Sequence, residues 1–229
     1  MRKKNKVKLV LYSGGQERSN HRIHKALVEL MGDKKRKTMT YIPFCSEGAK
    51  VYFGRFKRRY KAFGVTDFHL FPVDGPIDQD FLKTILKSDA IYLAGGNTFY
   101  FLHHLKKSGM LKILREYAIN GGILVGLSAG AIMMTPNIEM AAFPPFDPDE
   151  NEVHLKKLKA LDLVGFEFFP HYVNSKRNQE AMMMYSLISP NPVFGCKDGT
   201  GIIVDGDRTM LLGSVYMFFQ GKRLRLSHV

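Results

Sequence analysis

The sequence predicts an α/β fold: a mostly parallel β-sheet with helices on both faces and antiparallel hairpins at one edge. Apolar runs typical of buried strands alternate with amphipathic helical segments through the first part of the chain, as expected where a helix connects successive parallel strands. Glycine-rich turns follow several of these runs. The C-terminal part instead alternates short β-prone runs with glycine and aspartate turns. No repeat or linker divides the chain, so residues 1–229 are expected to form one domain.

The expected strands are short apolar runs bounded by turn residues. They cover Val7–Tyr12, Lys37–Phe44, Asp67–Phe71, Ala90–Ala94, Ile123–Val125, Phe166–Pro170 and Pro192–Cys196. Gly201–Leu226 is expected to supply the antiparallel hairpins, because Asp205-Gly206-Asp207 and Gln220-Gly221-Lys222 are typical turn sequences.

The expected helices carry apolar residues at helical spacing. In the first of them, Ile23, Ala26, Leu27 and Leu30 fall at positions i, i+3, i+4 and i+7. The helices are expected at Ser19–Met31, Val51–Phe63, Ile77–Leu86, Phe99–Lys107, Met110–Asn120, Val153–Leu161 and Gln179–Ile188. Met140–Asn151 is rich in proline and acidic residues and is expected to be an irregular loop.

The composition is that of a globular protein with a substantial core. Of the 229 residues, 45% are hydrophobic and 24% are charged. No apolar run approaches the roughly 20 residues of a transmembrane helix, and the two cysteines imply no disulfide framework. The N-terminal basic residues precede an apolar run that contains Lys8 and is too short for a signal peptide. A cytoplasmic location is therefore expected.

The net charge of +13 fits an acidic substrate, a nucleic acid or anionic membrane, or simply a basic solvated surface. The stretch Tyr52–Phe63 (YFGRFKRRYKAF) interleaves aromatic and basic residues. Its spacing favours an amphipathic helix with the aromatic side chains packed inward and the cations outside. We therefore do not expect a nucleic acid or a membrane to be the partner.

The stretch Gly121–Met134 (GGILVGLSAGAIMM) carries the strongest catalytic pattern. The apolar run Ile123–Val125 precedes Gly126-Leu127-Ser128-Ala129-Gly130, and a short helix is expected to begin near Ala129. Gly-x-Ser-x-Gly between a strand and a helix is the nucleophile-elbow pattern. The strained turn exposes the serine hydroxyl, and the helix N-terminus directs N–H groups at a developing negative charge. Ser128 is thus the candidate nucleophile.

A serine hydroxyl needs a base within hydrogen-bonding reach. Among the eight histidines, His171 is the best placed, because it follows the apolar run Phe166–Pro170 and sites in such sheets lie at the carboxyl ends of strands. The glycine-rich turns after the first and fourth expected strands, Ser13-Gly14-Gly15 and Gly95-Gly96-Asn97, should lie at the same edge.

The remaining histidines are better interpreted as surface or core residues. His21 and His24 have helical spacing for a metal, but no nearby acid or cysteine supports one. Neither a metal nor a cofactor is therefore expected. Cys45 also follows an expected strand, but no elbow pattern surrounds it, so it is interpreted as a small buried residue.

A base needs an orienting acid, and Asp198 follows the expected strand Pro192–Cys196. The competing acids Glu139, Asp147, Asp149 and Glu150 belong to the irregular segment after the elbow, which we interpret as a solvated acidic loop. The resulting chain order is serine, histidine, acid. It argues against an α/β-hydrolase, in which the acid precedes the histidine.

These motifs resemble those of the S51 serine peptidases, which comprise the aspartyl dipeptidases and the cyanophycinases. The shared segments, in the family's order, are YLAGGNT at Tyr92–Thr98, GLSAGA at Gly126–Ala131, FFPHY at Phe168–Tyr172 and GCKDGTGIIV at Gly195–Val204. The resemblance covers about Val7 to Leu212. It implies a flavodoxin-like fold related to the class I glutamine amidotransferases.

The resemblance implies that Ser128 is the nucleophile and His171 the general base. Asp198 lies where cyanophycinase-like members carry the triad glutamate. Glu139 and Asp147 remain alternatives, because some dipeptidases have been assigned an acid soon after the nucleophile.

The resemblance also implies roles for the turns around the serine. The backbone amides of Gly96 and Ala129 would form the oxyanion hole, and Gly95 and Asn97 would contact the substrate. The implied reaction is acyl transfer: hydrolysis of short peptides, expected to contain aspartate, through an acyl-enzyme. The expected partner is a small peptide substrate, and a homodimer is compatible with the sequence.

Two other functions stay open. A member of the same fold without a working acid would bind a small ligand or a partner without catalysis. A basic RNA- or anion-binding protein would show an affinity that falls steeply with salt. The related glutamine amidotransferases use cysteine at the elbow, so Ser128 argues against their chemistry.

Overall fold

The computed structural model describes residues 6–14 and 18–226 and confirms the α/β fold. Its larger sheet has seven strands, in the order β3 (Asp67–Leu70), β2 (Thr38–Ile42), β4 (Ala90–Leu93), β5 (Ile123–Leu127), β1 (Lys8–Tyr12), β8 (Gly201–Asp205) and β9 (Arg208–Leu212). The first five are parallel. The β8–β9 hairpin pairs antiparallel to β1 and forms the expected antiparallel edge.

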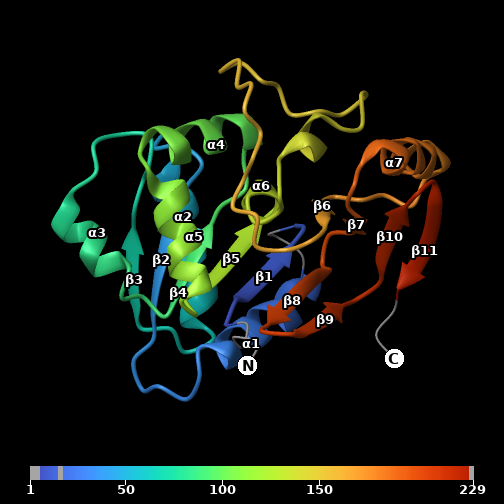
Figure 1. Cartoon of the computed structure of the whole chain (residues 1–229). Coiled ribbons are helices and arrows are strands. Elements are labelled where there is room, and N and C mark those ends of the chain that lie inside the picture. The colour runs from blue at the N-terminus through green and yellow to red at the C-terminus, as the bar shows by residue number, and fades with distance from the viewer. Residues whose placement is uncertain (1–5, 15–17, 227–229) are drawn as a thin grey trace, which may run out of the picture.

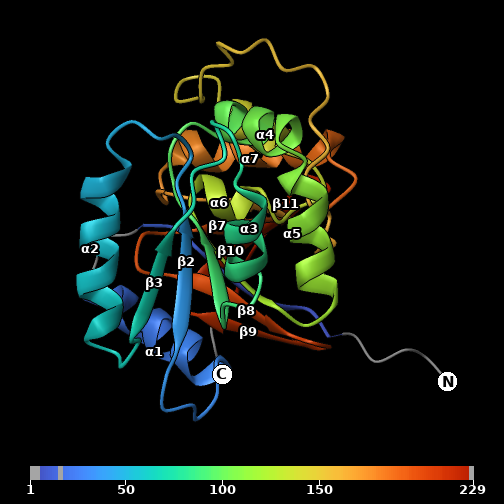
Figure 2. The same cartoon turned by 90° about the vertical axis from the view of Figure 1, so that its left-hand side faces the viewer.

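Helices cover both faces of this sheet (Figures 1 and 2). One face packs against α1 (His21–Leu30) and α2 (Ala49–Lys61), and the other against α3 (Gln79–Ile85), α4 (Thr98–Lys107) and α5 (Met110–Ile119). The alternation of side chains along each strand supplies both cores. On β1, Leu9 and Leu11 join the α3–α5 core, whereas Val10 and Tyr12 join the α1–α2 core. All four are fully buried, and each such side chain contributes roughly 1.5–3 kcal/mol.

A second, smaller sheet departs from the expectation that all C-terminal hairpins lie at one edge. Its order is β11 (Lys222–Leu226), β10 (Val215–Phe219), β7 (Val193–Cys196) and β6 (Glu167–Phe169). Helix α7 (Lys176–Ile188) packs on it, and Tyr216 and Phe218 of β10 share a third apolar cluster with Met182 and Tyr185 of α7. Only the β8–β9 hairpin therefore belongs to the edge of the larger sheet.

The helix expected at Val153–Leu161 is wrong, because this segment is irregular apart from one isolated bridge between Lys159 and Asn137. Its backbone pairs with the chain that follows the elbow: the Ile138 N–H donates to the Leu158 carbonyl at 3.0 Å, and the Leu161 N–H donates to the Met133 carbonyl at 3.0 Å. Leu158 packs against the α3–α5 core. Long-range pairing thus satisfies the backbone that a helix would otherwise satisfy. The remaining short elements are η1 (Arg18–Asn20), α6 (Ala129–Ile132) and η2 (Glu139–Ala142).

Three of the features singled out in the sequence lie outside the described residues. They are Gly15 of the first glycine-rich turn, the basic residues before Lys6 and the terminal His228. Within the described part of the chain, none of the helices has the length and apolarity needed to cross a bilayer.

The strand order brings the glycine-rich turns together. Strands β4, β5 and β1 are neighbours in the sheet and run parallel, so the turns that follow them lie at one edge, here called the carboxyl edge. Strand β8 begins at that edge, because its first residue, Gly201, lies opposite Tyr12 at the end of β1. Four segments distant in sequence therefore meet around Ser128.

Candidate active site

Ser128 lies in the sharp turn between β5 and α6. Its φ of 51° and ψ of −113° fall in a region that non-glycine residues rarely adopt, and its N–H donates to the Tyr12 carbonyl at 2.9 Å. The flanking glycines are required by close contact. A Cβ at Gly126 would overlap the backbone of Gly130, and one at Gly130 would overlap the Leu93 carbonyl. The Gly-x-Ser-x-Gly pattern thus lets α6 pack directly on the sheet.

His171 follows β6 and faces the serine. Its Nε2 lies 2.9 Å from Ser128 Oγ, and its Nδ1 lies 2.7 Å from Asp198 Oδ1. The tautomer with its proton on Nδ1 donates to the carboxylate and leaves Nε2 to accept the serine O–H. The side chains of His171 and Asp198 are 53% and 43% exposed, so a substrate can reach them from solvent. The backbone of His171 has a φ of 54°, in the left-handed region that non-glycine residues seldom adopt.

The turn after β1 holds the acid and the base together. The buried Ser13 hydroxyl donates to Asp198 Oδ1 at 2.8 Å and accepts the His171 backbone N–H at 2.5 Å. The next residue, Gly14, lies against Asp198, and a Cβ there would overlap the carboxyl group. Sequence reasoning placed this turn at the correct edge but gave it no role. The sequence feature that could have indicated this role is a serine and a glycine directly after a buried strand.

The other candidate acids lie apart from this arrangement. Among the described residues, neither Glu139 nor Asp147 forms a hydrogen bond or ion pair with His171. Asp149 instead accepts the backbone N–H of Thr98 at 2.7 Å, at the start of α4. The geometry therefore brings Asp198, and not an acid of the loop, to the histidine.

Two backbone amides at the carboxyl edge are free to bind a ligand. Within residues 6–14 and 18–226, the N–H groups of Gly96 and Ala129 donate to no protein acceptor. Ala129 begins α6. Gly96 has a φ of 142°, and a Cβ there would overlap the Phe44 ring. A Cβ at Gly95 would lie 3.4 Å from Ser128 Cβ, so the turn after β4 runs beside the serine.

Asn97 forms two hydrogen bonds within the protein. Its Oδ1 accepts the Tyr100 N–H at 2.8 Å and caps α4, and its Nδ2 donates to the Glu150 carbonyl at 2.8 Å. Asn97 thus ties the acidic loop (residues 140–151) to the turn beside the serine. The substrate contact expected for Asn97 stays a prediction.

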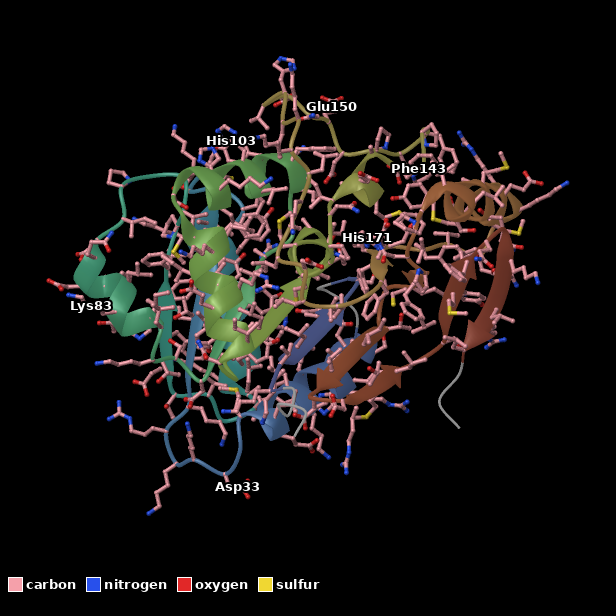
Figure 3. All side chains as sticks on the ribbon, viewed as in Figure 1. Asp33, Lys83, His103, Phe143, Glu150 and His171 are labelled. Carbon is pink, nitrogen blue, oxygen red and sulfur yellow. The ribbon has the colours of Figure 1, made fainter. Side chains whose placement is uncertain are left out.

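The acidic loop forms one wall of a pocket of about 250 Å³ that contains Ser128 and His171. Figure 3 shows Phe143 and Glu150 on this loop, above His171. The wall is largely apolar despite the acids, because Phe143 and Phe146 line it. The Arg177 guanidinium lies 3.5 Å from the centre of the Phe146 ring, so α7 supports the loop from outside.

The cysteines are poor alternatives to Ser128. Burial raises the pKa of the Cys196 thiol to about 12, and burial is the main cause that raises the pKa of the Cys45 thiol. A neutral thiol is a weak nucleophile. In the described part of the chain, no three His, Cys, Asp or Glu side chains are grouped so that they could hold a metal ion.

A strained serine in contact with a histidine that is itself oriented by a carboxylate is the arrangement of a serine-type hydrolase. A sequence profile of peptidase family S51 matches residues 9–212. The chain therefore belongs to peptidase family S51 and is a serine-type peptidase.

Individual relatives agree with this assignment. An uncharacterized peptidase of Listeria monocytogenes is 34% identical over 149 residues, which cover 64% of this chain and 71% of the relative. The probable alpha-aspartyl dipeptidase of Drosophila melanogaster is 26% identical over 202 residues, or 82% of this chain and 77% of the relative. The crystal structure of a Listeria monocytogenes protein assigned as a peptidase E matches with a TM-score of 0.70 and 26% identity, over 90% of this chain and 97% of that one.

Proposed function

We propose that the protein hydrolyses short peptides, with aspartate at the cleaved residue, through Ser128, His171 and Asp198. The observation that carries the proposal is the pair of contacts on one imidazole ring. One ring nitrogen lies 2.9 Å from the Ser128 hydroxyl and the other lies 2.7 Å from the Asp198 carboxylate.

Acylation begins when Ser128 Oγ attacks the substrate carbonyl and His171 Nε2 takes the hydroxyl proton. Asp198 keeps the other ring proton on Nδ1 and stabilises the imidazolium. The tetrahedral oxyanion is held by the N–H groups of Gly96 and Ala129, each of which contributes about 3 kcal/mol in comparable enzymes. His171 then donates its proton to the leaving amine, and the acyl group remains on Ser128.

Deacylation repeats these steps with water as the nucleophile. His171 Nε2 takes a proton from the water, which attacks the acyl carbonyl in the same oxyanion hole. Collapse of the second tetrahedral intermediate returns the proton to Ser128 Oγ and releases the acid product. The water supplies the proton that ends on Ser128 Oγ, so the protons balance over the two steps.

Three observations support a short substrate with an acidic residue. The pocket that contains Ser128 and His171 measures about 250 Å³ and is bounded by the acidic loop, which limits the length of chain that fits. The Drosophila relative is named an alpha-aspartyl dipeptidase, and the net charge of +13 would attract an acidic peptide. We also keep a cytoplasmic location as a prediction.

The test is active-site labelling by a fluorophosphonate, combined with hydrolysis of Asp-X, Glu-X and β-aspartyl dipeptides. The wild-type protein should be labelled once, and Ser128→Ala should lose both labelling and hydrolysis. Ser88→Ala is a matched control, because Ser88 is a buried serine that bonds Thr40 at the opposite edge of the sheet. Labelling that survives in Ser128→Ala, or a wild-type protein that is not labelled, would contradict the proposal.

A further inference from the structure

A second pocket lies on the other side of the Gly95–Gly96 turn. It measures about 290 Å³ and is lined by that turn, by Leu127 and by the face of α2 that carries Tyr52, Arg55 and Arg59. This face belongs to the aromatic and basic stretch that the sequence singled out and that the catalytic geometry does not use. The pocket therefore connects this unexplained stretch of α2 to the backbone of the oxyanion hole.

The two arginines lie at different depths. Helix α2 begins at Ala49, after β2, and therefore runs from the carboxyl edge back along the sheet. Arg59 is four residues after Arg55, which corresponds to about 6 Å along a helix. Arg55 is exposed, with its guanidinium 5.5 Å from the Tyr52 ring centre, whereas Arg59 is half-buried. Arg55 thus lies near the mouth of the pocket and Arg59 near its floor.

Arg59 lies beside buried phenol groups at this depth. Its side chain bonds the hydroxyl of Tyr92, and that hydroxyl in turn lies 2.6 Å from the hydroxyl of Tyr12. Tyr92 and Tyr12 are almost completely buried. A guanidinium that is fixed and partly withdrawn from water binds a carboxylate more strongly than a mobile surface cation.

The remaining walls favour an anion of modest size. Tyr41, Phe44 and Phe56 contribute aromatic surface, which lowers the local dielectric and strengthens electrostatic contacts. Burial raises the pKa of Tyr41 to about 12, so its hydroxyl remains neutral. The lining contains one carboxylate, that of Glu47, and the two guanidinium groups of Arg55 and Arg59. The net charge of the lining is therefore positive.

The position of the pocket decides which half of the substrate it meets. His171 must protonate the leaving amine, so the leaving half lies in the pocket that His171 lines. The second pocket shares Gly95 and Gly96 with the oxyanion turn, but His171 is not part of its lining. It is therefore placed to receive the acyl half, on the opposite side of the scissile bond.

We infer that this pocket selects a carboxylate on the acyl-side residue, and that Arg55 meets a short acidic side chain while Arg59 meets a longer one. The protein then accepts glutamyl as well as aspartyl peptides, with a different arginine for each. The inference rests on the proposed peptidase function and adds the residues that determine its specificity.

The test compares Asp-Leu and Glu-Leu with their neutral counterparts Asn-Leu and Gln-Leu. Arg55→Gln should lower the ratio of kcat/KM for Asp-Leu over Asn-Leu by about 10- to 100-fold, the value of one hydrogen bond between charged groups. Arg59→Gln should lower the ratio for Glu-Leu over Gln-Leu by a similar factor and change the aspartyl ratio less. Arg58→Gln is the matched control, because Arg58 is exposed on the same helix and outside the pocket lining.

Folding and catalysis are checked separately. Arg59→Lys keeps the positive charge if Arg59→Gln fails to fold, and should lower the glutamyl ratio by a smaller factor. Fluorophosphonate labelling should proceed at the wild-type rate in every folded variant. Unchanged ratios in both arginine variants, or an equal loss in Arg58→Gln, would overturn the inference while labelling stays intact. Failure of the proposed function would instead appear as a wild-type protein that is not labelled.

Discussion

The Ser13 hydroxyl donates a 2.8 Å hydrogen bond to Asp198 Oδ1. Ser13 Oγ also accepts the backbone N–H of His171, so one fully buried hydroxyl fixes both the acid and the backbone of the base. Neither of these two hydrogen bonds involves Ser128. We therefore treat it as a positioning residue that acts through Asp198 and His171.

Replacing Ser13 by alanine should slow catalysis without weakening substrate binding. Loss of a hydrogen bond to a charged group corresponds to about 1.5–3 kcal/mol, and we expect kcat to fall by about 10-fold or more with KM nearly unchanged. The measurement is steady-state hydrolysis of the best dipeptide, with the rate of fluorophosphonate labelling as a second readout.

Ser88→Ala is the control for a general loss of stability. It also removes a buried 2.8 Å hydroxyl hydrogen bond, to Thr40, but at the opposite edge of the sheet. Ser88→Ala should lose about 1 kcal/mol of unfolding free energy and Ser13→Ala at least as much, and only Ser13→Ala should lose activity. Equal kcat values in the two variants would show that Ser13 does not position the site.

The site shows how far sequence reasoning reaches. Ser128 and His171 were identifiable because each directly follows an apolar run, and Asp198 because it follows another. These are local signals. The contacts of Ser13 depend on β1 lying between β5 and β8, and nothing local to β1 reveals which strands become its neighbours.

The same limit explains the errors in the fold. Leu155 and Leu158 have helical spacing, but the backbone around them pairs with the segment after the elbow. Strand β10 has an ordinary strand pattern, yet Tyr216 and Phe218 pack against α7 in a separate sheet. In each case a long-range partner decided the structure, and periodicity carries no information about that partner.

Replacing Ser128 by glycine should stabilise the protein relative to Ser128→Ala. At a φ of 51° and ψ of −113° a side chain costs about 1–3 kcal/mol, which glycine relieves, whereas glycine adds about 0.5–1 kcal/mol of unfolded-state entropy. We expect the free energy of unfolding, measured by urea denaturation, to be about 1 kcal/mol higher for Ser128→Gly than for Ser128→Ala. Both variants should be inactive. A glycine variant less stable than the alanine variant would show that the elbow stores no strain.

His24 should make the protein less stable as the pH falls below neutral. Burial, together with the nearby Arg59 and His21, lowers the pKa of His24 from 6.5 to about 3, and within the described residues its Nε2 is buried without a hydrogen-bond partner. At a pH between these two pKa values, His24 is protonated in the unfolded chain and neutral in the folded protein. The free energy of unfolding is therefore highest above pH 6.5 and falls by up to about 1.4 kcal/mol per pH unit below it.

His24→Phe removes this titration while keeping an aromatic ring against Tyr12 and Tyr60, whose ring centres lie 5.8 and 5.3 Å from that of His24. Between pH 7.5 and 5.0 the variant should lose about 2 kcal/mol less unfolding free energy than the wild type. His104, whose pKa is also lowered mainly by burial, titrates in both proteins and cancels in the comparison. Urea denaturation at half-unit pH steps measures the difference. Parallel curves for the two proteins would mean that His24 takes up its proton equally well in the folded state.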